Sequence, residues 1–215
     1  GDGIDDFALG APEAQGRAPW SGAVWVIYGR DIAGGATPFD TIDLTALAPE
    51  AGFALLGAVA NADLGWSVAA AGDVNGDGIG DIVIGAPGLG SETESQSGGA
   101  YVIFGRNVAA GADPFNTLDL GTLAALDGLA LPGGGDRSSL GLSVASAGDL
   151  NGDGFDDLIL GAPGLASDPT ARGAAVVIYG GSFASRLSGS LGNDTLSGSR
   201  GSDALLGFSG DDALF

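Results

Sequence analysis

The sequence predicts an all-β protein, and three observations lead to that fold class. First, GDVNGDGIGDIVIGAP, from Gly72, returns as GDLNGDGFDDLILGAP, from Gly148, so the chain repeats with a period of about 76 residues. Second, the apolar residues fall in short runs rich in Val, Ile, Leu and aromatic residues, separated by turns of Gly, Pro and Asp. Third, no window carries a convincing 3.6-residue apolar stripe bounded by helix caps, so helix should be scarce.

Each complete repeat is predicted to form four short strands. In the complete unit they are expected at residues 66–71, 81–85, 100–104 and near 129–131. Alternation of side chains is clearest in the second strand, and β-branched and aromatic residues dominate the third. The Ala- and Leu-rich stretches 46–56 and 123–130 are the places most compatible with a short helical turn.

The opening GDGIDDFALGAP is the tail of the same unit, so residues 1–180 hold about two and a half units. Tandem units of four antiparallel strands suit a β-propeller, in which each blade buries its faces against its neighbours. A propeller needs at least about four blades to close. We therefore expect this sequence to be part of a longer chain.

Composition excludes several classes of function. The chain has no His, Cys or Lys, which rules out Ser-His-Asp and Cys-His catalysis, imidazole or thiolate metal sites, disulfides and a P-loop lysine. The formal net charge of −20 would be repelled by phosphate backbones, so we expect no nucleic-acid partner. No uncharged apolar stretch reaches the roughly 18 residues of a membrane span, so no span is expected either. Hard cations are the natural partners of such a chain.

An Asp-rich loop lies between the first two predicted strands of each unit. In DVNGDGIGD, which begins at Asp73, side-chain oxygens fall at positions 1, 3, 5 and 9, and a main-chain carbonyl is available at position 7. Glycine at positions 4 and 6 permits the tight reversal that wraps the chain about an ion. The carboxylates would repel one another unless a cation lay between them. An all-oxygen ligand set with loose geometry favours Ca²⁺ over Mg²⁺ and over soft metals.

The predicted ligands come from two complete loops and one incomplete loop. They are Asp73, Asn75, Asp77, the Ile79 carbonyl and Asp81; Asp149, Asn151, Asp153, the Phe155 carbonyl and Asp157; and Asp2, the Ile4 carbonyl and Asp6. An EF-hand is excluded because its acidic position 12 is occupied here by Ile84 or Leu160. The alternative is that DG and NG merely form β-turns, but a turn does not require Asp at positions 1, 5 and 9 together.

The period changes near the end of the chain. Residues 189–215 are three nonapeptides, each with Gly at positions 1 and 4, Asp at position 6 and Leu at position 8. The carboxylates of Asp194, Asp203 and Asp212, with neighbouring turn carbonyls, are predicted to bind calcium between stacked turns. The alternative is a flexible Gly/Ser-rich linker, which would not require the strict recurrence of Asp and Leu.

Both repeats resemble known families. Gly-Trp-Ser-Val or Gly-Leu-Ser-Val followed by Gly-Ala-Pro, flanking an Asp-rich loop, resembles the FG-GAP repeat of integrin-α-type propellers, with Leu-Gly in place of Phe-Gly. The nonapeptides are similar to the RTX repeat GGxGxDxUx, which forms a calcium-loaded parallel β-roll, although Ser190, Ser199 and Phe208 replace the second Gly. The resemblance implies integrin-α-like propeller blades over 1–180, a linker over 181–188 and RTX repeats over 189–215.

The order of the two repeats resembles that of large bacterial proteins exported by type I secretion. This implies a secreted or cell-surface calcium-binding module for adhesion or matrix building, folded by calcium after export. A protein or glycan ligand is expected on the face opposite the calcium loops, where Trp20 and residues 92–96 lie. Packing at the propeller rim explains Trp20 equally well, and a solvated loop also explains residues 92–96. The alternatives are a propeller accessory to a secreted hydrolase and an architectural subunit. We recognise no catalytic constellation in this segment.

Overall fold

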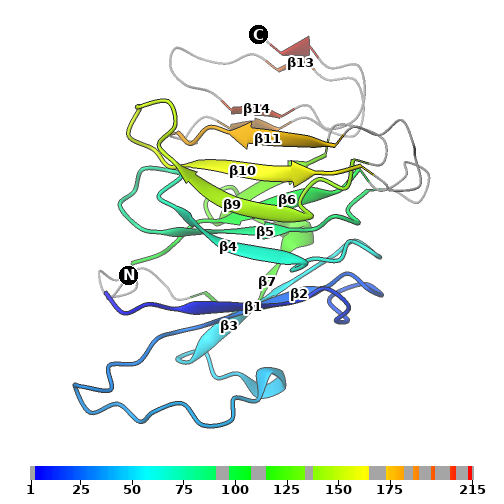
Figure 1. The fold of residues 1–215 in the computed structure, drawn as a ribbon. Helices are drawn as coiled ribbons and strands as arrows, with labels where there is room; N and C mark the ends of the chain where they lie inside the picture. The colour runs from blue at the N-terminus through cyan, green and yellow to red at the C-terminus, as the bar shows by residue number, and fades with distance from the viewer. Residues whose placement is uncertain are drawn as a thin grey trace.

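Three β-sheets follow one another along the chain, and a pair of small sheets follows them (Figure 1). The computed structural model describes residues 3–90, 97–107, 115–133, 138–164 and 173–181, and the backbone of four short strands after residue 185. The all-β prediction is confirmed, since the helical elements described are two single 3-10 turns, Leu44–Ala46 and Leu120–Thr122. The two Ala- and Leu-rich stretches themselves contribute the strands β3 and β8.

The second sheet contains the four strands that the repeat predicts. They are β4 (Ser67–Gly72), β5 (Asp81–Gly85), β6 (Gly99–Ile103) and β8 (Gly128–Pro132), paired antiparallel in the order β4-β5-β6-β8. The third sheet repeats the first three of them as β9 (Ser143–Gly148), β10 (Asp157–Ala162) and β11 (Ala174–Ile178).

The first sheet is completed by a strand from elsewhere in the chain. It consists of β1 (Phe7–Ala11), β2 (Ala23–Ile27), β3 (Gly52–Leu56) and β7 (Leu118–Asp119). β1 to β3 pair antiparallel, whereas β7 lies parallel to β3 with Leu118 opposite Leu55. Because β7 belongs to the segment that joins β6 to β8, the second unit extends the sheet of the first.

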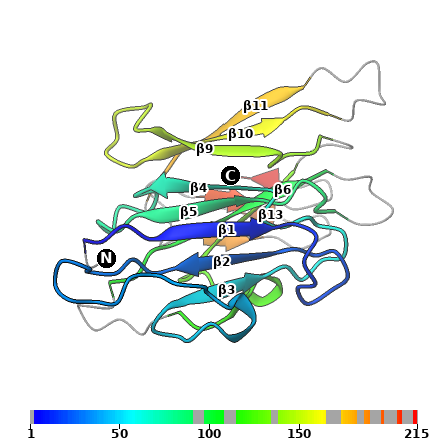
Figure 2. The ribbon, with the colours of Figure 1, turned by 60° about the horizontal axis from the view of Figure 1, so that its bottom comes forward.

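The second sheet lies between the other two and is buried on both faces (Figure 2). Val83 and Val102 pack in the core shared with the third sheet, and Ile84 and Tyr101 pack in the core shared with the first. Successive side chains of a strand point to opposite faces, so a doubly covered strand needs a continuous apolar run. This is why β6, which is buried along its whole length, reads GAYVI without polar alternation.

Glycines of the repeat motifs allow neighbouring sheets to approach closely. A Cβ added to Gly85, in the Gly-Ala-Pro motif, would lie 1.9 Å from the carbonyl oxygen of Gly141, in the Leu-Gly motif of the next unit. The same contact joins Gly10 to Gly65 one unit earlier, at 2.0 Å. Gly65 and Gly141 have φ of +88° and +86°, which disfavours a side chain there as well. The glycines of the two motifs therefore lie where neighbouring blades contact each other.

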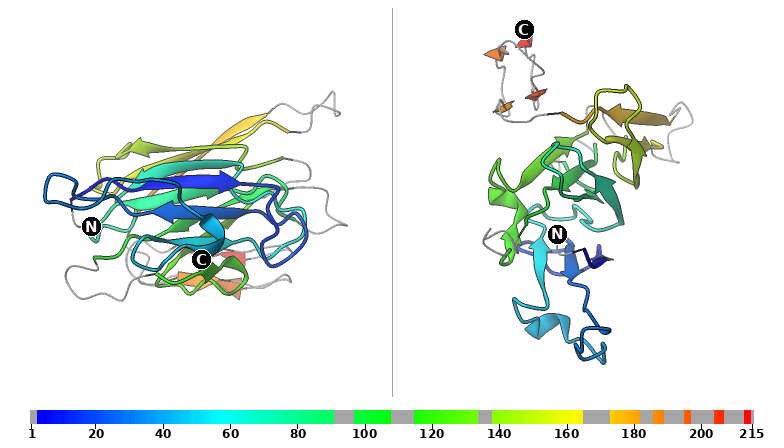
Figure 3. Two further views of the ribbon diagram at one scale, coloured as in Figure 1. Left: turned by 90° about the horizontal axis from the view of Figure 1, so that it is seen from below. Right: turned by 90° about the vertical axis from the view of Figure 1, so that its left-hand side faces the viewer.

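The last four strands recur every nine residues and form two small parallel sheets (Figure 3). β12 (Arg186–Ser188) pairs with β14 (Ala204–Leu206), and β13 (Thr195–Leu196) pairs with β15 (Ala213–Leu214). Partners lie two nonapeptides apart, as in a parallel β-roll. The segment predicted as a linker, 181–188, thus includes the strand β12, whose Leu187 lies nine residues before Leu196.

Candidate functional site

Two Asp-rich loops connect the first two strands of the second and third sheets, β4 to β5 and β9 to β10, on the left in Figure 1. We call them loop A (residues 73–81) and loop B (residues 149–157). Gly76 and Gly78 of loop A have φ of +75° and +82°, and the corresponding glycines of loop B have +78° and +92°. Both loops therefore adopt the left-handed turns that glycine at positions 4 and 6 was expected to provide.

The carboxylate at position 1 lies at the centre of each loop. Oδ1 of Asp73 accepts hydrogen bonds from the amides of Gly76 (2.8 Å) and Asp77 (3.0 Å), and Oδ2 accepts one from Gly78 (2.8 Å). In loop B the carboxylate of Asp149 accepts from Gly152, Asp153 and Gly154 at 2.7, 3.1 and 2.9 Å. The hydrogen bond from Gly154 is the largest cause that holds the pKa of Asp149 below its usual value.

The side chains at positions 3 and 5 lie beside each other. Oδ1 of Asn75 accepts from the amide of Asp77 at 2.9 Å, and the Asn75 side-chain amide donates to Oδ2 of Asp77, also at 2.9 Å. Oδ1 of Asp77 accepts from the amide of Ile79 at 2.8 Å. Asn151, Asp153 and Phe155 repeat all three contacts in loop B at 2.9, 2.9 and 3.0 Å. Loops A and B therefore have the same internal geometry.

The carboxylate at position 9 is buried at the start of the second strand. Asp81 is 2% exposed, and its oxygens accept from the amides of Val74 (2.9 Å) and Gly105 (2.8 Å). Burial, reinforced by the charges of Asp77 and Asp73 but opposed by the two hydrogen bonds, raises the pKa of Asp81 to about 6. Asp157 is fully buried and accepts from Leu150 and Gly180, both at 2.8 Å.

The amides that hold position 9 were not foreseen from the sequence. Gly29, Gly105 and Gly180 follow β2, β6 and β11, and each donates its amide at 2.8 Å to the position-9 carboxylate of its own unit. The carboxylate in the opening loop is Asp6, which is exposed. The sequence does contain a signal for these amides. An aromatic residue followed by glycine comes directly after β2, β6 and β11 in the three units.

The residues of both loops suit a hard cation. Their donors are carboxylate, amide and carbonyl oxygens, the ligands that Ca²⁺ prefers. Among the described residues, the ion pairs Arg17–Asp119 and Arg106–Asp127 lie outside the loops, so Asp81 forms no ion pair with an arginine there. The described carboxylates are not gathered in threes at one point, because the loop amides hold them individually. Oδ1 of Asp73 accepts two hydrogen bonds, but Oδ2 accepts one, so a lone pair of Oδ2 remains for a cation, and Asp149 has the same pattern.

Other predicted ligands are only partly placed. In the opening loop Ile4 is half-buried, and the Ile79 and Phe155 positions of loops A and B are half-buried too. Asp2, Asp194, Asp203 and Asp212 lie outside the described residues.

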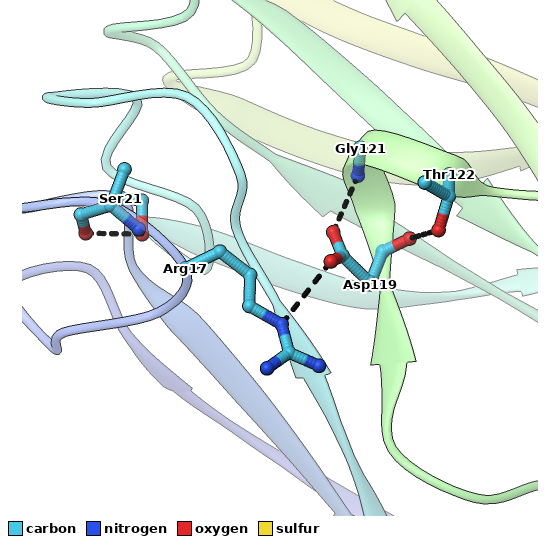
Figure 4. Close-up of polar contacts among 6 residues, drawn as sticks. Arg17, Ser21, Asp119, Gly121 and Thr122 are labelled. Atoms are coloured by element: carbon cyan, nitrogen blue, oxygen red, sulfur yellow. Dashed lines mark hydrogen bonds and ion pairs between the residues drawn. The ribbon is translucent and has the colours of Figure 1, made fainter.

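The connection between β1 and β2 lies at the opposite ends of the strands from loops A and B, on the right in Figure 1. Trp20 lies on it with 51% of its surface exposed and with φ of 55°. Arg17, on the same connection, reaches across to Asp119 of β7 with Nε 3.2 Å from Oδ2 (Figure 4). Residues 92–96, which were expected to share this face, lie outside the described part of the chain. Among the described residues, no helix has the length and apolar character needed to cross a bilayer.

Comparison with known proteins identifies both repeats. The family model of the FG-GAP repeat matches residues 64–103 and 140–178. That of the RTX calcium-binding nonapeptide repeat, in four copies, matches residues 177–215.

Several curated proteins are similar to this chain. Phosphatidylinositol-glycan-specific phospholipase D of Mus musculus is 38% identical over 142 residues, covering 66% of this chain and 16% of the relative. Integrin alpha-7 of Homo sapiens is 34% identical over 205 residues, covering 87% of this chain and 14% of the relative. The chain thus spans less than about a fifth of the length of these relatives. It contains integrin-like FG-GAP repeats followed by RTX calcium-binding nonapeptide repeats, and its metal cofactor is Ca²⁺.

Proposed function

We propose that this chain is an extracellular calcium-binding module of an adhesion or surface-matrix protein, folded and rigidified by Ca²⁺. One observation carries the proposal: loops A and B share one hydrogen-bond pattern, and each places a buried carboxylate beside oxygen ligands without an arginine partner among the described residues. A calcium ion would provide the countercharge that these carboxylates lack. Scarce in the cytosol and abundant outside the cell, calcium would link folding to export, for which type I secretion is our proposed route.

We propose that the ion in each loop is held at positions 1, 3, 5, 7 and 9. These are Asp73, Asn75, Asp77, the Ile79 carbonyl and Asp81 in loop A, and Asp149, Asn151, Asp153, the Phe155 carbonyl and Asp157 in loop B. We assign the incomplete opening loop (Asp2, Ile4 and Asp6) and the nonapeptide residues Asp194, Asp203 and Asp212 as further calcium ligands on their spacing alone.

The test is a crystal structure determined in millimolar calcium. Each loop should hold an ion with about 6–8 oxygen ligands at roughly 2.3–2.6 Å, and its anomalous signal should identify calcium. Ligand distances of about 2.0–2.1 Å in octahedral geometry would indicate magnesium instead. Empty loops A and B at saturating calcium would refute the assignment.

The adhesion role requires a ligand surface, which we place on the face opposite the loops. The exposed indole of Trp20 supports this choice, because exposed aromatic residues are enriched at interfaces. Trp20→Ala should weaken adhesion to a protein or glycan ligand while changing the melting temperature little. Loss of adhesion only when loops A and B are mutated, with Trp20 silent, would reject this surface.

A second candidate is an accessory role beside a hydrolase. The similarity to phosphatidylinositol-glycan-specific phospholipase D supports it, since that relative extends well beyond the matched region. In that case the catalytic residues would lie outside this segment. A parent protein that hydrolyses phosphatidylinositol-glycan, and loses this activity when these blades are removed, would favour this role over adhesion.

A further inference from the structure

One residue of loop B reaches out of its own loop. Asp156 occupies position 8, which is not a predicted ligand position. Its Oδ2 accepts a hydrogen bond from the amide of Asp73 at 2.8 Å, and its own amide donates to the Asp73 carbonyl at 3.1 Å. Asp156 therefore binds both main-chain polar groups of the residue at position 1 of loop A.

The neighbours of Asp156 also touch loop A. A Cβ added to Gly76 would lie 2.2 Å from Cε1 of Phe155, so the aromatic ring covers position 4 of loop A. The amide of Gly181, which follows β11, donates to the carbonyl of Val74 at 2.9 Å. At the equivalent glycine of loop B, Gly152, an added Cβ would meet no atom of the described residues within 4 Å. Loop A is thus held from outside by residues of the third unit.

We infer that Asp156 couples the two calcium loops, so that calcium in loop B raises the affinity of loop A. The inference rests on the proposed function, because it requires that both loops bind calcium. Asp156 lies between two predicted ligands of loop B, the Phe155 carbonyl and Asp157. An ion that fixes these two ligands fixes Asp156 between them, and Asp156 fixes Asp73. Loop A then has less conformational freedom left to lose when its own ion binds.

The proposed coupling predicts that calcium in one loop raises the calcium affinity of the other. Two cations in adjacent loops repel each other, so direct electrostatics alone would make the second ion bind more weakly. A hydrogen-bonded connection that orders the second site acts in the opposite direction. Coupling is also reciprocal, so the loops must raise each other's affinity by the same factor.

The experiment follows each loop separately in the full chain by NMR during a calcium titration. The amides of Gly78 and Gly154 donate to the position-1 carboxylates of loops A and B, so their resonances report loop occupancy independently of the nonapeptide repeats. Asp153→Ala disables loop B. We expect it to raise the calcium midpoint at Gly78 about tenfold, within the usual range of couplings between sites. Asp77→Ala should raise the midpoint at Gly154 by the same factor.

Variants of Asp156 test whether its hydrogen bonds to Asp73 carry the coupling, as opposed to the loss of charge in loop B. In an Asp156→Ala background, Asp153→Ala should shift the Gly78 midpoint less than about twofold, whereas a purely electrostatic effect would persist. Asp156→Asn keeps an acceptor oxygen and should retain the coupling. Asp5→Ala, at the same position of the opening loop, should leave the Gly78 midpoint unchanged.

Two outcomes would contradict these expectations. A Gly78 midpoint that does not depend on loop B overturns the inference but not the proposed function. If the amides of Gly78 and Gly154 still show no change at calcium concentrations far above about 10⁻³ M, the proposed function is overturned and the coupling with it.

Discussion

At the scale of single residues, the buried carboxylates at position 9 combine two roles. Asp81 accepts hydrogen bonds from Val74 and Gly105 and is also a proposed ligand. Asp81→Asn removes the charge and leaves one oxygen to serve two amides. We expect a loss of about 1–3 kcal/mol in the free energy of unfolding, the usual result of an unsatisfied buried polar group, together with weaker calcium binding at loop A. Urea denaturation with and without calcium measures both effects. Asp40→Asn, an exposed position with the same charge change, should show neither.

The glycines of the Gly-Ala-Pro motif give a second prediction at this scale. In Gly85→Ala the new methyl group would meet the carbonyl oxygen of Gly141, which is backbone and cannot rotate away. We expect the second and third sheets to separate locally, at a cost of about 1–3 kcal/mol or more in urea denaturation. The matched control is Gly80→Ala, where an added Cβ meets no atom within 4 Å. Equal stability of the two variants would mean that the close approach does not hold the sheets together.

At the scale of elements, the repeat predicted most of the strands but not the exchange between units. The four strands of the second sheet lie within one residue of their expected positions, because they carry apolar runs between glycine turns. β7 has only two residues, and no local pattern distinguishes it from a loop. It pairs as a strand because the neighbouring unit offers the free edge of β3, a tertiary effect that local propensity does not encode.

The candidate sites show the same limit. The ligand spacing and glycine turns of loops A and B could be read from the sequence, because they depend on residues within nine positions of one another. The contact between Asp156 and Asp73 could not, because it joins residues 83 positions apart across two sheets. Position 8 is Asp in the opening loop and in loop B but Gly in loop A, and nothing in the repeat indicates which residue such an Asp would contact.

The segment that carries β7 can be tested through one aromatic ring. Phe115 is 6% exposed, and its ring centroid lies 4.7 Å from that of Phe53 on β3. Phe115→Ala should cost about 3–5 kcal/mol and speed hydrogen exchange at the amides between β3 and β7. Phe39 is the equivalent residue of the first unit. Arg30 lies over its ring as Arg106 lies over that of Phe115, but Phe39 is 40% exposed. Phe39→Ala should cost much less, and similar costs would show that the segment is not held by burial of Phe115.

At the scale of the whole molecule, the two complete loops are enough to make stability depend on calcium. Extracellular calcium modules bind with dissociation constants of about 10⁻⁴–10⁻³ M. At 10 mM calcium a site of about 10⁻⁴ M adds roughly 2.7 kcal/mol to the free energy of unfolding. Two such loops would add about 5 kcal/mol, comparable with the total of about 5–15 kcal/mol for many domains.

Chelation should therefore lower the melting temperature of the chain by about 10–20 °C, since about 1 kcal/mol corresponds to roughly 2–4 °C at this size. The measurement is a pair of thermal melts, one in about 10 mM calcium and one in excess chelator. Monovalent salt at matched ionic strength controls for screening, and it should recover only the general repulsion of the acidic surface. Asp77→Ala with Asp153→Ala should remove the part of the shift that comes from loops A and B. An unchanged melting temperature would contradict folding by calcium even if a crystal held ions, because an ion that binds the folded chain alone must stabilise it.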